Sequence, residues 1–171
     1  MSRTDFLRFF ISAFAVLSSV GYAAESVSLI REGDRIVVVG DSITGQSAGQ
    51  SGYVTLMKEG LAAAHVETKT TVTPLGGSGQ TVGSWRSVEK QSREKEVILD
   101  VKGIDVKATL DGGAEVLIVM LGMNNVLRPD VENTSESIDK WAADYRELVG
   151  SLQARTKARV VAVATNQKER R

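Results

Sequence analysis

The chain has 171 residues, 42% of them hydrophobic and 25% charged, which fits one globular domain with a real core and nearly excludes a two-domain enzyme. Basic and acidic residues number 21 each, so no net charge favours nucleic acid, anionic lipid or an acidic partner. The absence of cysteine excludes disulfides, thiolate zinc sites and cysteine nucleophiles, and the presence of one histidine, His65, excludes multi-histidine metal sites.

The amino terminus is predicted to be a secretory signal peptide over residues 1–24. Arg3 and Arg8 give a basic start, residues 9–20 are almost continuously apolar, and Ala23 and Ala24 supply small residues for a signal peptidase. The apolar stretch is shorter than the ~20 residues that a membrane-spanning helix needs. A buried amphipathic first helix is the alternative, but the stretch has hardly any polar face. We therefore expect export to the periplasm or the outside, without a stable membrane anchor after cleavage, and one domain over residues 25–171.

The first part of the mature chain is predicted to alternate between strands and a helix. Residues 35–40 form a β-branched run that is typical of a central strand in a parallel sheet, and the run ends at a glycine. Residues 53–64 place apolar side chains at helical spacing. Residues 66–72 alternate as a second strand would, and residues 74–79 are rich enough in glycine and proline to predict a loop.

The middle of the chain gives a weaker pattern. Residues 85–96 are highly charged and fit a solvated helix, residues 97–101 fit a short strand, and residues 104–110 have mixed periodicity. No internal repeat and no long linker separates this stretch from its neighbours. We expect it to decorate the same domain.

The last part of the chain returns to clear elements. Residues 115–121 are an apolar run closed by a glycine and predict a second central strand. Residues 137–154 carry a strong helical stripe, with Asn133 or Ser135 as the expected cap, and residues 158–164 predict another strand. This alternation predicts an α/β sheet with right-handed crossovers.

Polar residues beside glycines follow three of the predicted strands. They lie in residues 40–44, 76–81 and 122–125. In an open parallel sheet, ligands bind at the carboxyl ends of the strands, where the loops converge and helix amino termini point their free N–H groups. The three segments are therefore expected to meet in one site.

Ser42, Gly76 and Asn124 are the candidate catalytic residues in these segments. The Ser42 hydroxyl is expected at a strand-to-helix turn, near backbone N–H groups that can stabilise a developing oxyanion. Gly76 has no side chain, so its N–H can approach a substrate oxygen, and the Asn124 amide can supply a third donor. One nucleophile with three donors predicts acyl transfer.

The three segments also resemble the three leading sequence blocks of the SGNH, or GDSL, hydrolases, in the same order and strand context. The resemblance implies a flavodoxin-like three-layer α/β/α fold with a mostly parallel sheet. It implies that Ser42 is the nucleophile, and that the Ser42 amide, Gly76 and Asn124 form the oxyanion hole. It also implies esters of lipids, simple acyl compounds or acetylated carbohydrates as substrates, and no cofactor. Asp41 and Asn125 are predicted to contact the substrate beside them.

Two departures from the family pattern affect this interpretation. Asn125 stands where the third block usually has aspartate, which puts the local hydrogen bonding in doubt. The family's final block, an aspartate and a histidine three residues apart, is absent. His65 is expected between a helix and a strand at the opposite edge of the sheet, as a solvated residue rather than a base. Because a serine without a base is a poor nucleophile, severe impairment is expected.

The resemblance to the SGNH hydrolases also predicts that the sequence lacks the family's last strand, last helix and Asp-His loop. The final strand would then form an exposed edge beside an uncovered flank of the sheet, and poor solubility would follow.

Other interpretations of the motifs are weaker. Each segment taken singly fits an ordinary turn. Trp85 and Trp141 fit packing better than carbohydrate stacking. Neither the phosphate-binding P-loop pattern nor GxGxxG after the first strand is present, so nucleotide binding is disfavoured. The spacing of the aspartates predicts no metal site. A ligand-binding remnant without catalysis and a structural or partner-binding secreted domain remain as alternative functions.

Overall fold

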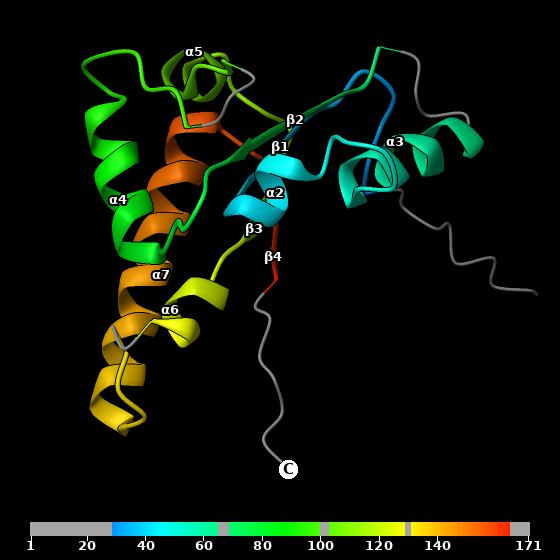
Figure 1. The fold of residues 1–171 in the computed structure, drawn as a ribbon. Helices are drawn as coiled ribbons and strands as arrows, with labels where there is room; N and C mark the ends of the chain where they lie inside the picture. The colour runs from blue at the N-terminus through cyan, green and yellow to red at the C-terminus, as the bar shows by residue number, and fades with distance from the viewer. Residues whose placement is uncertain (1–28, 65–68, 100–102, 129–130, 165–171) are drawn as a thin grey trace, which may run out of the picture.

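The protein is described by a computed structural model, which covers residues 29–64, 69–99, 103–128 and 131–164. The predicted signal peptide and His65 lie outside these described residues. A parallel sheet with the strand order β2-β1-β3-β4 forms the centre of the molecule (Figure 1). Its strands are β1 (Arg35–Gly40), β2 (Thr71–Gly76), β3 (Val116–Met120) and β4 (Val160–Ala164).

Helices cover both faces of the sheet, so the chain has three layers (Figure 1). One face carries α4, α5 and α7, whose bounds are Val82–Gln91, Val106–Asp111 and Ser135–Thr156. The opposite face carries α3 (Tyr53–Ala63). The prediction of a three-layer α/β/α fold with a mostly parallel sheet is confirmed.

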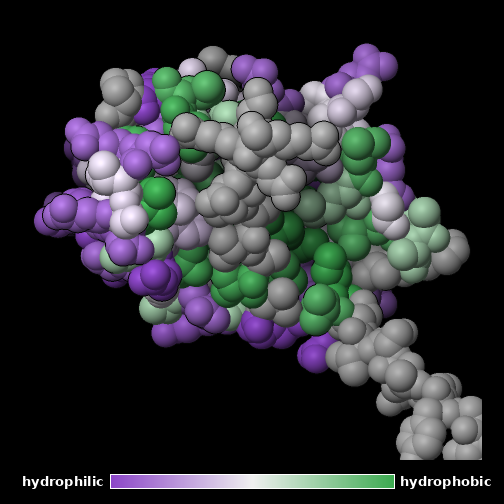
Figure 2. Space-filling view, turned by 90° about the horizontal axis from the view of Figure 1, so that it is seen from below, coloured by the Kyte–Doolittle hydropathy of each residue, from purple (hydrophilic) through white to green (hydrophobic). Residues whose placement is uncertain are grey.

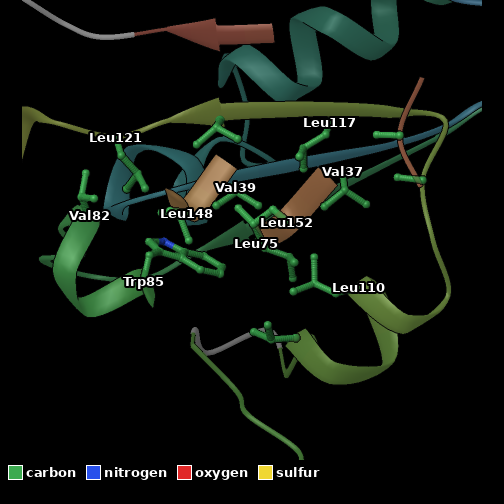
Figure 3. Packing of buried hydrophobic residues seen from close by; sticks show 14 of the residues in the cluster. Val37, Val39, Leu75, Val82, Trp85, Leu110, Leu117, Leu121, Leu148 and Leu152 are labelled. Atoms are coloured by element: carbon green, nitrogen blue, oxygen red, sulfur yellow. The ribbon is translucent and has the colours of Figure 1, made fainter. Parts of the chain in front are cut away.

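Alternating side chains of the strands explain the two layers of core. Val37 and Val39 of β1 point to the face of α4 and α7, where Trp85 and Leu148 meet them (Figure 3). Ile36 and Val38 point to the other face, against α3. Since β1 is buried on both faces, its sequence is an unbroken apolar run, as predicted for a central strand.

Two short helices lie at the carboxyl edge of the sheet. The first, α2 (Ser42–Gln46), follows β1 directly, and the second, α6 (Met123–Leu127), follows β3. Gly122 precedes α6 with φ of 130°, a conformation that residues with a side chain rarely adopt. Both helices begin within three residues of a strand end, which fixes their positions above the sheet.

The prediction for the second strand was partly wrong. Residues 66–68 lie outside the described part, and β2 begins at Thr71 and continues through Pro74 to Gly76, a stretch that was predicted as loop. Proline is tolerated here because β2 is an edge strand of the described sheet, where alternate N–H groups face away from the ladder. The loop therefore begins only after Gly76.

Several other element boundaries also differ from the predictions. The helix predicted at 85–96 is shifted: it starts earlier, at Val82 after the capping box of Thr81 and Ser84, and it ends at Gln91. The predicted strand at 97–101 is, in its described part, one isolated bridge between Ile98 and Asp105. The mixed stretch at 104–110 becomes α5, because Asp105 caps it through two backbone N–H groups.

The strands predicted at 115–121 and 158–164 and the helices predicted at 53–64 and 137–154 are confirmed with small shifts. Thr134, rather than Asn133 or Ser135, caps α7. None of the helices in the described ranges is both long and apolar enough to cross a membrane.

Candidate active site

The strand register places the three motif segments at one level. Gly40, the last residue of β1, pairs with Gly76 on one side and with Met120 on the other. The segments that follow these three residues therefore leave the sheet side by side at its carboxyl edge. This is the arrangement that was predicted for residues 40–44, 76–81 and 122–125.

Ser42 is the first residue of α2, and its side chain is half-exposed. The preceding residue, Asp41, is buried and caps the helix: its Oδ1 accepts a hydrogen bond from the Ile43 N–H at 2.9 Å. Its backbone carbonyl accepts one from Gly45 N–H at 2.9 Å. Within the described residues, the Ser42 hydroxyl has no hydrogen-bond partner. The Ser42 hydroxyl therefore lies at the amino-terminal end of α2, where the unpaired backbone N–H groups carry a partial positive charge.

Gly76 lies against the backbone of α2. A Cβ atom at this position would sit 2.3 Å from Gly45 N and 2.4 Å from Asp41 O. Both neighbours are backbone atoms, which cannot turn aside as a flexible side chain can. The close approach of β2 to the turn that carries Ser42 thus requires glycine at position 76.

Asn124 ties the three segments together. Its Nδ2 donates to the backbone carbonyl of Gln80 at 2.9 Å and, more weakly, to Asp41 Oδ2 at 3.4 Å. An amide nitrogen has two hydrogens, and both have acceptors here. To serve as an oxyanion donor, Asn124 must exchange the longer of the two bonds for one to the substrate.

Asn125 is 7% exposed and holds the start of α4. Its Oδ1 accepts a hydrogen bond from the backbone N–H of Val82 at 3.2 Å. An aspartate, the usual residue of the family at this place, would offer the same kind of acceptor. The departure from the pattern therefore leaves this hydrogen bond in place.

Two polar contacts around the site were not predicted from the sequence. The buried Trp85 donates from Nε1 to the carbonyl of Gly40 at 2.7 Å and so satisfies the end of β1. Tyr53 lies with its hydroxyl 2.7 Å from Thr44 Oγ1, and burial raises the pKa of this phenol. Tyr53 thereby joins α3 to α2. No local signal in the sequence links these pairs, which are separated by tens of residues or belong to different helices.

The described residues contain no histidine beside Ser42, because the one histidine of the chain is His65. In the same part of the chain, no group of three or more histidine, cysteine, aspartate or glutamate side chains is placed to hold a metal ion. The site as described consists of a serine hydroxyl, backbone N–H groups, an amide and a buried carboxylate.

Residues 38–170 match the model of the GDSL-like lipase/acylhydrolase family. Among solved structures, Axe2, an acetylxylan esterase from Geobacillus stearothermophilus, is 25% identical with a TM-score of 0.54 over 78% of this chain and 60% of that one. The acetyl xylan esterase AlAXEase is 21% identical with a TM-score of 0.53 over 74% and 56%. The chain thus spans about three fifths of the length of these esterases. A comparison with curated proteins returned no match.

Proposed function

Because the chain belongs to the GDSL-like lipase/acylhydrolase family, we propose that its site serves the hydrolysis of ester bonds, with Ser42 as the nucleophile. The observation that carries this proposal is the hydrogen bond from Asn124 to Asp41, the residue before Ser42. It brings the amide of the third motif segment next to the turn of the first. Gly76, packed on the same turn, supports the inclusion of the second segment.

In the proposed reaction, the Ser42 hydroxyl attacks the carbonyl carbon of the ester and passes its proton to a water molecule of the solvent, because the described residues place no histidine beside it. The carbonyl oxygen becomes an oxyanion, which the N–H groups of Ser42 and Gly76 and the amide of Asn124 stabilise. The alcohol leaves with a proton, and water then releases the acid from the acyl-enzyme and restores the serine. No cofactor takes part in these steps.

Asp41 and Asn125 make hydrogen bonds to the backbone around the site. Their side-chain oxygens accept hydrogen bonds from Ile43 and Val82, and from Asn124 in the case of Asp41. These contacts favour a positioning role, because they fix the first turns of α2 and α4. Their predicted contact with substrate stays a prediction.

The rate of the chain itself is expected to be low. Its sequence has no aspartate and histidine three residues apart, so the Ser42 proton has no base of the kind that the family uses. Serine hydrolases that lack a triad member keep only ~10³ to 10⁴-fold catalysis over water, from the oxyanion hole and from binding. We expect turnover in that reduced range.

The substrate class that we favour is an acetylated carbohydrate. The support is that both esterases named above are acetyl xylan esterases. A general acyl ester is the broader alternative. The predicted signal peptide at residues 1–24 would place this activity outside the cytoplasm, and amino-terminal sequencing of the exported protein would show whether the leader is removed near Ala24.

A binding protein without catalysis is the second candidate function. It is favoured by one observation, the lack of any histidine near Ser42 in the described residues. Such a protein would keep the cradle of donors and bind the ester or its acid product without turnover. A partner-binding secreted domain would instead keep its interaction after Gly76→Ala and Asn124→Ala.

Turnover of p-nitrophenyl acetate by the wild-type chain and by Ser42→Ala distinguishes the first two functions. Ser87→Ala is the matched control, since Ser87 is an exposed serine of α4. For an esterase we expect hydrolysis above the buffer rate in all three proteins, from the donors and from binding, and a lower rate in Ser42→Ala than in the wild type and Ser87→Ala, because only Ser42 can form the acyl-enzyme. Equal rates in all three proteins would contradict catalysis by Ser42 and favour the binding protein.

A further inference from the structure

The charged residues of the candidate site are few, and one of them is exposed. The three motif segments and α6 with its carboxyl-terminal cap contain two charged residues, Asp41 and Arg128. Asp41 is buried, and its carboxylate oxygens accept hydrogen bonds from Ile43 and Asn124. Arg128, directly after α6, is exposed. The charge that these segments present to solvent is therefore positive.

The guanidinium of Arg128 lies on the glycine loop that follows β2. A Cβ atom added to Gly79 would sit 2.4 Å from Nη2 of Arg128 and 3.3 Å from its Cζ. Gly79 has φ of 70°, a conformation that glycine adopts readily, and its lack of a side chain leaves room for the guanidinium. The planar cation thus packs against the backbone of the second motif segment.

Two hydrogen bonds keep Arg128 close to the proposed oxyanion donors. Its backbone N–H donates to the carbonyl of Asn124 at 3.1 Å. The Asn124 amide in turn donates to the carbonyl of Gln80, the residue after Gly79, at 2.9 Å. Consecutive Cα atoms are ~3.8 Å apart, so the Cα atoms of Gly79 and Gly76 are separated by no more than about 11 Å. An ester bound at these donors can therefore reach the guanidinium with a group at its far end.

Arg128 has no partner for its charge among the described residues. It makes neither an ion pair nor a side-chain hydrogen bond there. Other arginines in the same part of the chain do form ion pairs, namely Arg35, Arg86, Arg93, Arg155 and Arg159. The guanidinium of Arg128 therefore keeps its fork of N–H donors for an anion, and a carboxylate matches that fork with two parallel hydrogen bonds.

We propose that Arg128 binds a carboxylate of the substrate and so selects esters that carry one. The ester part of this inference rests on the proposed function, whereas the binding of a carboxylate does not. Since the guanidinium is exposed, water weakens the ion pair, and a preference of about three- to tenfold over an equivalent neutral ester is expected. Neutral esters remain substrates but are hydrolysed more slowly.

Hydrolysis of 4-acetoxybenzoate and of the neutral 4-acetoxybenzamide tests this selection. Both are acetates of the same ring, and they differ in the charge of the group opposite the ester. Because their intrinsic reactivities also differ slightly, the ratio of their kcat/KM values, corrected for the buffer rate, is compared between proteins. We expect this ratio to fall about three- to tenfold in Arg128→Gln. Arg128→Lys keeps the charge and should retain most of the ratio.

Arg146→Gln is the matched control. Arg146 is an exposed arginine of α7, outside the motif segments, and it likewise has no ion pair among the described residues. The ratio should therefore stay at the wild-type value in this variant. An unchanged ratio in Arg128→Gln, or an equal fall in both variants, would overturn the proposal.

Binding of 4-hydroxybenzoate, the product that keeps the carboxylate, tests the site without an ester. Titrations followed by ligand NMR signals should give a Kd of ~1 to 20 mM for the wild type, and weaker binding by threefold or more in Arg128→Gln. Equal binding by the two proteins would overturn the proposal. If Ser42→Ala hydrolyses esters as fast as the wild type while Arg128→Gln loses binding, the proposed function fails and the carboxylate site stands. If Ser42→Ala loses turnover while Arg128→Gln keeps both ratio and binding, the reverse holds.

Discussion

At Gly76 the end of β2 touches the backbone of α2, with no room for a side chain between them. We expect Gly76→Ala to lower the free energy of unfolding by about 1–3 kcal/mol, because the added Cβ would meet Gly45 N and Asp41 O at 2.3 and 2.4 Å. Urea denaturation measures this change. Turnover that depends on Ser42 should fall as well, since α2 must shift.

Gly60→Ala is the control for this change. Gly60 lies in α3, and nothing lies within 4 Å of a Cβ added there. Alanine favours a helix over glycine by up to about 1 kcal/mol, so this variant should be as stable as the wild type or more so. Equal effects at positions 60 and 76 would show that the contact of Gly76 with α2 is unimportant.

At the scale of residues, the sequence predicted that three motif segments meet at one edge of the sheet, but not which hydrogen bonds their side chains make. A glycine at the end of an apolar run predicted the ends of β1 and β3, and the register places Gly76 beside Gly40 at the same edge of the sheet, whereas the catalytic roles of Ser42, Gly76 and Asn124 stay a prediction. The acceptors of Asn124 are a carbonyl and a carboxylate from two other segments. Such pairs depend on the packing of loops, which no local pattern encodes.

At the scale of elements, Arg155 joins the three helices of one face. It lies in α7 with only 5% of its side chain exposed. It bonds Asp111, the last residue of α5, at 2.8 Å, and Ser92, directly after α4, also at 2.8 Å. The buried carboxylate of Glu89 lies 3.7 Å away. The guanidinium therefore holds these helix ends in place.

We expect Arg155→Ala to lower the free energy of unfolding by about 2–4 kcal/mol, because it leaves the buried Ser92 carbonyl and the Glu89 carboxylate with fewer partners. Arg93→Ala is the matched control. Arg93 also pairs with Glu89, at 2.6 Å, but its side chain is 51% exposed, so about 1 kcal/mol or less should be lost. Thermal unfolding of both variants checks the difference, and similar losses would contradict the role of Arg155.

The elements that were predicted well are determined by a pattern of neighbouring residues, whereas those that were predicted badly depend on how strands are arranged in space. The apolar run of β1 and the long stripe of α7 each bury a continuous pattern, so periodicity alone identified them. The second strand contains Pro74, which argues against a central strand but not against an edge. Whether a strand lies at the edge follows from the order of the strands in space, and the periodicity of residues along the chain does not reveal that order.

At the scale of the whole molecule, ion pairs clamp the edge of the sheet opposite the candidate site. Arg35 at the start of β1 bonds Glu115, which precedes β3, at 2.9 Å, and it also reaches Gly112. Arg159, which precedes β4, pairs with Asp34. These contacts join the amino ends of three strands.

The first of these pairs makes the fold sensitive to acid. The side-chain hydrogen bond from Arg35 holds the pKa of Glu115 at about 2, below its ordinary value of 4.5. Bonds from Arg155 and Lys107 likewise hold the pKa of Asp111 at about 2. A depressed carboxyl pKa stabilises the folded state above the unfolded value, and this stabilisation is lost as the pH falls through the folded value.

We therefore expect the free energy of unfolding to decrease between about pH 4.5 and pH 2. Glu115→Gln should flatten this dependence by a small amount, because both partners are about a third exposed or more and solvent screens the pair. Urea titrations at pH 7, 4 and 2.5 compare the two proteins. A steeper acid loss in the variant than in the wild type would contradict this assignment.

Figure 2, seen from below the view of Figure 1, shows apolar surface exposed among the polar residues of the molecule. Exposed apolar side chains occur on α2 and α6, the two short helices at the carboxyl edge of the sheet. The exposed fraction is 46% for Ile43 of α2, and 66% and 72% for Val126 and Leu127 of α6. These side chains lie on the helices that directly follow β1 and β3, whose carboxyl ends carry the candidate site.

The two outer strands of the described sheet are unequal in one respect. Pro74 interrupts the row of donors along β2, whereas β4 has no proline in its sequence Val-Val-Ala-Val-Ala. Of these two strands, only β4 offers an incoming strand a row of donors without a proline. Within the described sheet, Pro74 thus protects β2 against pairing with a further strand, whereas β4 carries no such protection in its own sequence.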